Sequence, residues 1–269
     1  MAPVSKTSTA TLPENWNQAV AGLFRFLGTD RFHEALRHAI EQCCAFDSMI
    51  VSKQQGSSAP QAVFHYLDDI QAAISLTFYA SGPYLLDPFY IACRENRQPG
   101  AYGLMELAPE TFFRSEYFRV FYRKIRIKDE LGILIADGSD KWMTVSLARR
   151  PGQPNFSKGD ITRVNAAFNL LSAAVLRNWG DNSQSDRKES GASDEDKLQD
   201  FGADVLSPRE AQIIRLILLG HSSPSAAAFL GIAEGTVKVH RRHAYTKLGI
   251  SSQAELFSLI TQFLSAQGN

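Results

Sequence analysis

The chain has 269 residues, 44% of them hydrophobic, and its 28 Lys and Arg residues balance 28 Asp and Glu residues. This length accommodates one large domain and one small domain, with ample chain to bury a core. No apolar run reaches the length of a membrane span, and the first 15 residues lack the pattern of a signal peptide. We therefore expect a cytoplasmic protein that does not enter a membrane.

Three cysteines, Cys43, Cys44 and Cys93, have neither the spacing of a metal site nor the even number of a disulfide framework. We expect reduced thiols, no bound metal and no cofactor. The adjacent pair Cys43 and Cys44 has two interpretations, as buried helix residues or as a redox sensor.

Residues 1–12 are small and hydroxylated and are predicted to be disordered. Apolar residues at helical spacing predict one helix from Trp16 to Gly28 and a second from Asp30 to Cys43. Residues 48–53 and 62–67 are predicted strands, joined by a loop that contains Gly56 and Pro60. A third helix is expected to begin at Asp68 or Asp69 and to carry Ile70, Ile74 and Phe78.

The following stretch predicts a strand over 100–107 and a helix from Pro109 to Tyr122. Strands 131–136 and 142–148 flank a turn, and Ser157 is expected to cap a long helix. About five short strands among these helices predict an α+β fold, a three-layer α/β/α sensor domain with a mostly antiparallel sheet over residues 13–180.

Residues 181–204 contain eight acids and three cations and are predicted to form an acidic flexible linker. From residue 205 to 269 there are six cations and three acids, a net charge of +3 before histidines. A basic domain behind an acidic linker is consistent with binding of nucleic acid under the control of the rest of the chain.

Four helices are predicted in residues 205–269. Ser207 and Glu210, with a proline between them, form a capping box at the start of the first helix. The second begins at Ser223 and stops at Gly231, and the fourth begins at Ser252. A helix of small residues, a short glycine turn and a longer basic helix predict a helix-turn-helix within this all-α domain.

The third of these helices, between Gly231 and Gly249, separates its apolar residues from its basic residues. At about 100° per residue, Val237, Ala244 and Leu248 share one stripe. The predicted base-contacting residues on the opposite arc are Lys238, Val239 and Arg242, and the predicted phosphate-contacting residues are Thr236, Arg241, His243 and Lys247. The alternative is an amphipathic surface helix with a solvated basic face.

Several short motifs occur in order in this part of the chain. They are Leu206-Ser-Pro-Arg-Glu210, Gly220-His-Ser222, Leu230-Gly-Ile232, Gly235-Thr-Val-Lys-Val-His-Arg-Arg242 and Lys247-Leu-Gly-Ile250. Together they resemble the LuxR-type (GerE-like) DNA-binding domain. The resemblance implies that the third helix is the recognition helix and that the fourth forms a dimer contact.

Two positions depart from that family's pattern. The second helix carries Ser225-Ala-Ala227 where the family has Glu-Ile-Ala, and Ala233 replaces the usual Ser or Thr cap of the recognition helix. Loss of such a cap costs about 1 kcal/mol of local stability. We expect these departures to alter fine geometry and to leave the fold intact.

The segment Tyr79-Ala-Ser-Gly-Pro-Tyr84-Leu-Leu-Asp87-Pro88 resembles the ligand-contact segment of autoinducer-binding LuxR-type regulators. The resemblance implies that Asp87 binds the polar head of an acyl-homoserine lactone while aromatic residues cover the rest. The candidate ligand-binding residues are Tyr79, Tyr84, Asp87, Phe89 and Trp142. A spacing one residue shorter, and the absence of the family's upstream tryptophan, argue against that particular ligand.

Two other interpretations of this first domain stay open. Residues 117–150 also resemble the GAF/PAS-like sensors of other LuxR-type proteins. Alternatively, the tyrosines belong to the core and Asp87 caps the following helix.

The sequence therefore predicts a transcriptional regulator whose promoter binding is controlled by a small molecule in the first domain. The expected partners are double-stranded promoter DNA, a small-molecule effector and a second copy of the chain, with RNA polymerase as a further candidate. An orphan regulator whose first domain dimerises or binds a protein is the alternative. No motif supports an enzyme, and the order of elements disfavours a phosphorylated receiver domain.

Overall fold

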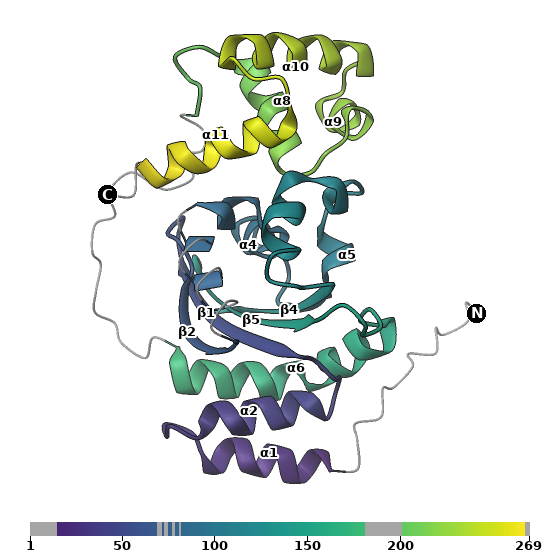
Figure 1. The fold of residues 1–269 in the computed structure, drawn as a ribbon. Coiled ribbons are helices and arrows are strands. Elements are labelled where there is room, and N and C mark those ends of the chain that lie inside the picture. Colours follow the sequence, from purple (N-terminus) through teal and green to yellow (C-terminus); the bar gives the residue numbers. More distant parts are fainter. Residues whose placement is uncertain are drawn as a thin grey trace, which may run out of the picture.

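The computed structural model describes residues 15–68, 72, 75–76, 79–80, 82–180 and 201–266. The predicted disordered N-terminus, most of the helix expected from Asp68 or Asp69, and residues 181–200 of the predicted linker lie outside this part of the chain. A sheet with helices on both sides forms the lower part of the molecule in Figure 1, and a group of helices lies above it.

The sheet contains five strands, β1 (Ser48–Gln55), β2 (Gln61–Tyr66), β3 (Gly100–Gly103), β4 (Asp129–Ala136) and β5 (Lys141–Arg149). Their order is β2-β1-β5-β4-β3, and every neighbouring pair is antiparallel. The predicted three-layer α/β/α fold with an antiparallel sheet is confirmed.

One face of the sheet is covered by α6 (Lys158–Trp179), with α2 (Phe32–Glu41) and α1 (Trp16–Arg25) stacked beyond it (Figure 1). Successive strand residues point to opposite faces. Leu131 and Ile133 of β4 therefore pack in the core that the three helices share.

The opposite face carries short helical segments: η2 (Pro83–Leu86), α4 (Pro88–Arg94), α5 (Leu104–Leu107), η3 (Phe112–Arg114) and η4 (Phe118–Tyr122). A close approach of chain segments occurs at Gly132 of β4, where an added Cβ would lie 2.4 Å from the Phe89 ring. This face therefore depends on a glycine in the middle of a strand to admit an aromatic side chain.

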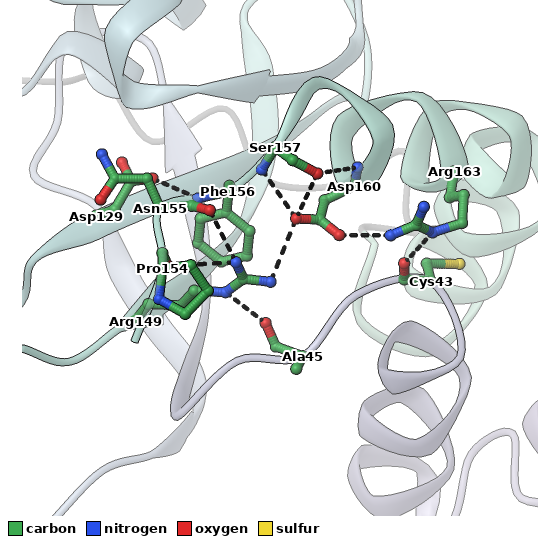
Figure 2. A network of polar contacts seen from close by, with 10 residues as sticks. All are labelled: Cys43, Ala45, Asp129, Arg149, Pro154, Asn155, Phe156, Ser157, Asp160 and Arg163. Carbon is green, nitrogen blue, oxygen red and sulfur yellow. Dashed lines mark hydrogen bonds and ion pairs between the residues drawn. The ribbon is translucent and has the colours of Figure 1, made fainter. Parts of the chain in front are cut away.

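A buried ion pair attaches α6 to the end of β5 (Figure 2). The guanidinium of Arg149 lies 3.3 Å from Oδ2 of Asp160 and donates to the backbone carbonyl of Ala45 at 2.8 Å. Asp160 also completes the capping box at the start of α6 and pairs with Arg163, which donates to the carbonyl of Cys43. The two carboxylate oxygens of Asp160 thus position the sheet, α6 and the end of α2 together.

Two predicted elements of the first domain differ from the observed ones. The predicted strand 100–107 ends at Gly103 and continues as α5. The predicted helix from Pro109 to Tyr122 is divided into η3 and η4, because Ser115 has extended backbone and its Oγ accepts a hydrogen bond from the amide of Phe118 at 3.1 Å. A serine within an apolar pattern therefore ends one helical turn and begins the next.

The C-terminal group comprises α8 (Pro208–Leu218), α9 (Ser223–Leu230), α10 (Glu234–Leu248) and α11 (Gln253–Ala266). The predicted capping box of Ser207 and Glu210 is present, and Gly249 adopts the left-handed conformation at the end of α10. None of the helices in the described ranges is both long enough and apolar enough to cross a membrane.

Candidate DNA-binding surface and ligand cavity

Helix α10 presents its basic face to solvent and buries the opposite face. Val237 and Ala244 are fully buried against the other helices of the group. The predicted base-contacting residues Lys238, Val239 and Arg242 are exposed. In Figure 1 this helix lies at the end of the molecule farthest from the sheet, so its outer face points away from the domain that contains the sheet.

The flanking residues of α10 differ in what they contact. Thr236 and His243 are exposed, whereas the guanidinium of Arg241 lies over the Tyr245 ring at 5.1 Å. The ammonium of Lys247 lies 2.7 Å from Oε2 of Glu210, the capping carboxylate of α8. Hydrogen bonds from Lys247 and from the backbone of Ser207 lower the pKa of Glu210 to about 2.

The first turn of α10 has no side-chain cap, because its N-cap residue is Ala233. Lys238 forms an ion pair of 2.7 Å with Glu234 in this turn, and both side chains are largely exposed. Such an exposed pair contributes at most about 1 kcal/mol, so the lysine can exchange this partner for DNA at little cost.

A cavity of about 470 Å³ lies on the sheet face opposite α6. Its apolar wall comes from Ile50 on β1, Phe121 on η4, and Leu67, Leu76, Ile125 and Ile127 from connecting segments. In the sheet, Glu130 pairs with Ala148 and Ala148 pairs with Ser48, so these three residues form a row across β4, β5 and β1 at the cavity floor.

Two buried carboxyl groups face this cavity. Asp87 accepts a hydrogen bond of 2.6 Å from the hydroxyl of Tyr79 and one of 2.7 Å from the amide of Phe89, so it also caps α4. Glu130 accepts a hydrogen bond of 2.7 Å from the hydroxyl of Tyr122. Burial raises the pKa of Asp87, and burial with the nearby charge of Asp87 raises the pKa of Glu130 to about 8.

The segment that carries Asp87 also contacts the C-terminal helices. An added Cβ on Gly82 would lie 2.6 Å from the side chain of Leu264 on α11. Leu85 and Tyr90 line a groove together with Leu216 of α8. A second contact is a hydrogen bond from the hydroxyl of Thr111 to the carbonyl of Gly220. The two domains therefore pack on one another directly.

Residues 204–260 match the model of a family described as bacterial regulatory proteins, luxR family. An HTH-type transcriptional regulator of Aeromonas salmonicida, named for the exeN 3' region, is 28% identical over 186 residues, which are 66% of this chain and 94% of that protein. Residues 204–260 therefore match the luxR family, and the relatives that this chain resembles are transcriptional regulators.

Two further likenesses differ in extent. The transcriptional regulatory protein MctR of Rhizobium johnstonii is 44% identical over 55 residues, 20% of this chain and 26% of that protein. The crystal structure of the VqsR LBD domain from Pseudomonas aeruginosa has a TM-score of 0.53 at 19% identity and covers 61% of this chain and 96% of that one. The second likeness concerns the fold alone.

Among the candidate ligand-binding residues, the structure brings Tyr79 and Asp87 together at the cavity. It places Tyr84 and Phe89 in the core and Trp142 beside a separate surface hollow on β5. Asp87 caps α4, as one of its two interpretations predicted, and it also lines the cavity, where its contact with a ligand stays a prediction.

Glu130 was not among the predicted site residues. The sequence predicted the strand to begin at Leu131, two residues after its observed start at Asp129, and so Glu130 fell outside the predicted strand. The available signal was the charge of Glu130. This residue lies two positions before Gly132, on the strand face opposite to that of Leu131 and Ile133. This signal identifies a site residue only when it is known which face of the strand borders the cavity, and the position of the cavity depends on tertiary packing.

The cysteines are all buried and free. Burial raises the pKa of Cys43 to about 11 and of Cys44 and Cys93 to about 12. Because thiolates are the reactive form, this favours the interpretation of Cys43 and Cys44 as core residues over a redox sensor. Within the described ranges, no group of three or more His, Cys, Asp or Glu side chains is placed to hold a metal ion.

Proposed function

We propose that this chain is a LuxR-type regulator that binds promoter DNA as a homodimer and that a small molecule in the cavity on the sheet controls this binding. The observation that carries the proposal is the cavity itself, about 470 Å³ with an apolar wall and a few convergent polar groups. Pockets of about 300–1,000 Å³ with this composition are typical of small-molecule sites.

The proposed DNA contact uses the exposed face of α10. Lys238 and Arg242 are set to donate to guanine in the major groove, and Val239, 44% exposed, is set to contact a thymine methyl group. Thr236, Arg241, His243 and Lys247 flank this face and are proposed to contact phosphates. Lys247 would then share its ammonium between Glu210 and the DNA.

The proposed coupling runs through the segment between Tyr79 and Tyr90. Tyr79 and Asp87 line the cavity, and Gly82 and Tyr90 of the same segment contact α11 and the α8 groove. A ligand that moves this segment changes the contacts that hold the C-terminal helices, and this shifts the population of arrangements able to bind DNA. The coupling therefore does not require the linker to transmit force.

The proposed homodimer involves α11, α6, or both. Leu259 of α11 is partly exposed, and Leu170 of α6 is 38% exposed on a helix whose other side is buried. Two copies that present two recognition helices would bind an inverted repeat. RNA polymerase is proposed as a further partner of the DNA-bound dimer.

The experiment that tests this function combines ligand binding with DNA binding. Full-length protein is screened by thermal shift against a metabolite panel that includes acyl-homoserine lactones, because ligands that bind the folded state raise its apparent stability. Each hit is then tested for a change in affinity for DNA sites selected from a random pool. Stabilising ligands that change DNA affinity support the proposal, whereas DNA binding that no ligand alters supports an orphan regulator.

A further inference from the structure

The ionisable side chains that line the cavity are acidic and are not balanced by basic ones. Within the described ranges, its charged lining residues are Asp87 and Glu130, and no Lys, Arg or His lines it. The other polar lining groups are hydroxyls and an amide, from Tyr79, Ser48, Ser52, Ser75, Ser146 and Gln61. The cavity therefore presents acid groups to an occupant without a basic group beside them.

The hydrogen bonds that these carboxyl groups receive come from neutral donors. Asp87 is bound by the Tyr79 hydroxyl and by the amides of α4, and Glu130 is bound by the hydroxyls of Tyr122 and Ser146. Neutral donors reduce the cost of burying a carboxylate but do not cancel its charge. When either carboxyl group is ionised, its charge therefore has no basic residue in the described cavity lining to compensate it.

The hydroxyl of Tyr117 is a third polar group of this region. It is buried and has no hydrogen-bond partner among the residues that the structure describes. Burial raises the pKa of this tyrosine, and the charges of Asp87 and Glu130 raise it further. A buried hydroxyl without a partner is rare, because leaving it unsatisfied costs about 1–3 kcal/mol.

The electrostatics exclude an anionic occupant and favour a cation. A carboxylate or phosphate in this cavity would face two acid groups without a basic residue to neutralise it. An ammonium group would instead receive charge-assisted hydrogen bonds from both sides. Burial raises the pKa of Glu130 to about 8 and so keeps it protonated. A bound ammonium would lower this pKa and favour the ionised carboxylate.

The apolar part of the cavity determines the chemistry of the remainder of the ligand. Ile50, Phe121, Ile125 and Ile127 provide an apolar wall around the acid groups. A molecule that fills this space must therefore carry a hydrocarbon portion beside its polar head.

We propose that the effector of this regulator is an amphipathic amine, with its ammonium between Asp87 and Glu130 and its hydrocarbon portion against the β1 and η4 wall. The proposal rests on the proposed function, in which this cavity is the effector site.

The test uses full-length protein and three probes with the same hydrocarbon chain: hexylamine, 1-hexanol and hexanoate. Binding is measured by calorimetry and by the shift in the unfolding midpoint. We expect hexylamine to bind and to stabilise the protein, 1-hexanol to bind more weakly and hexanoate not to bind. Equal or tighter binding of 1-hexanol or hexanoate, or no binding of hexylamine at millimolar concentration, would overturn the proposal.

Variants then locate the ammonium. Glu130→Gln should lower the hexylamine affinity at least about tenfold and leave the 1-hexanol affinity unchanged, because it removes one charge-assisted hydrogen bond. Ser52→Ala, the matched control, removes a hydroxyl from the β1 side of the same cavity and keeps both acids together with the hydroxyls of Tyr79, Tyr122 and Ser146. Unchanged hexylamine affinity in Glu130→Gln contradicts the proposal, and the three-probe comparison on the unaltered protein holds even if a variant folds poorly.

The outcome separates this proposal from the proposed function. If a neutral acyl-homoserine lactone binds the cavity and changes DNA affinity, and hexylamine does not displace it, the proposal of an amine effector is wrong while ligand control is retained. Hexylamine binding that depends on Glu130, with no effect of any cavity ligand on DNA affinity, would establish the amine site and contradict ligand control.

Discussion

The hydroxyl of Tyr122 lies 2.7 Å from Oε2 of Glu130 and donates a hydrogen bond to it across the interior face of the sheet. This contact joins η4 to β4 at the cavity. It also places an ionisable group where the protein around it excludes water, and so the protonation of that group is linked to folding.

The first prediction concerns the pH dependence of stability. The pKa of Glu130 is about 8 in the folded protein and 4.5 ordinarily. The folded state therefore holds a proton that the unfolded state releases between these values, and stability falls as pH rises from about 4.5 to about 8. Glu130→Gln lacks this proton and should gain stability relative to the unaltered protein over that range.

The measurement is urea unfolding of both proteins at a series of pH values. A stability difference that stays constant from pH 5 to pH 8.5 would show that Glu130 ionises normally in the folded state.

The second prediction concerns the attachment of α6. Asp160→Asn removes the charge that faces Arg149 and keeps an oxygen for the Ser157 cap. Because a buried guanidinium is left without its partner, we expect a loss of about 3–5 kcal/mol in the free energy of unfolding. Asp30→Asn, at an exposed position, is the control and should change stability by less than about 0.5 kcal/mol. Equal effects of the two substitutions would show that the pair contributes little.

The third prediction separates base from phosphate contacts on α10. Lys238→Ala and Arg242→Ala should each weaken specific DNA binding by about 1–3 kcal/mol and relax base preference. Arg241→Ala and His243→Ala should weaken binding to all sequences alike. Selection from randomised sites measures both effects, and an unchanged preference in Lys238→Ala would rule out its base contact.

The fourth prediction concerns the dimer. Leu256, Leu259 and Phe263 form the proposed dimer face of α11, and of these Leu256 is buried whereas Leu259 and Phe263 remain partly accessible. Leu259→Glu should abolish cooperative occupancy of an inverted repeat, whereas Gln262→Glu, at an exposed position, should retain it. Tight binding of a monomer to a single half-site would contradict the dimer.

The helices of the C-terminal domain could be predicted because their signals are local. A cap, a periodic apolar face and a terminal glycine lie within one segment, and each of these appears at α8 and at the end of α10. The same holds for β1, β2 and the Ser157 cap of α6.

The cavity could be predicted only in part, because it is formed by residues far apart in the sequence. The Tyr79–Asp87 pair lies within one segment and was found, whereas Glu130 becomes a site residue only when β4 pairs with β5 and β5 with β1. Tyr84 and Phe89 lie in the same aromatic-rich segment as Tyr79, and the sequence does not distinguish them from it. Tertiary packing places the side chains of Tyr84 and Phe89 in the core. The interdomain contact of Gly82 with Leu264 likewise has no local signal.

The carboxylate of Glu210 serves two helices at once. It closes the capping box with Ser207 and holds the last turn of α10 through Lys247. A substitution at 247 that removes the charge leaves this carboxylate without its cation, and a substitution at 210 releases both helices. Across relatives of this chain, positions 210 and 247 should therefore change together, a correlation that arises from the orientation of the recognition helix and that would persist among regulators with different DNA sites.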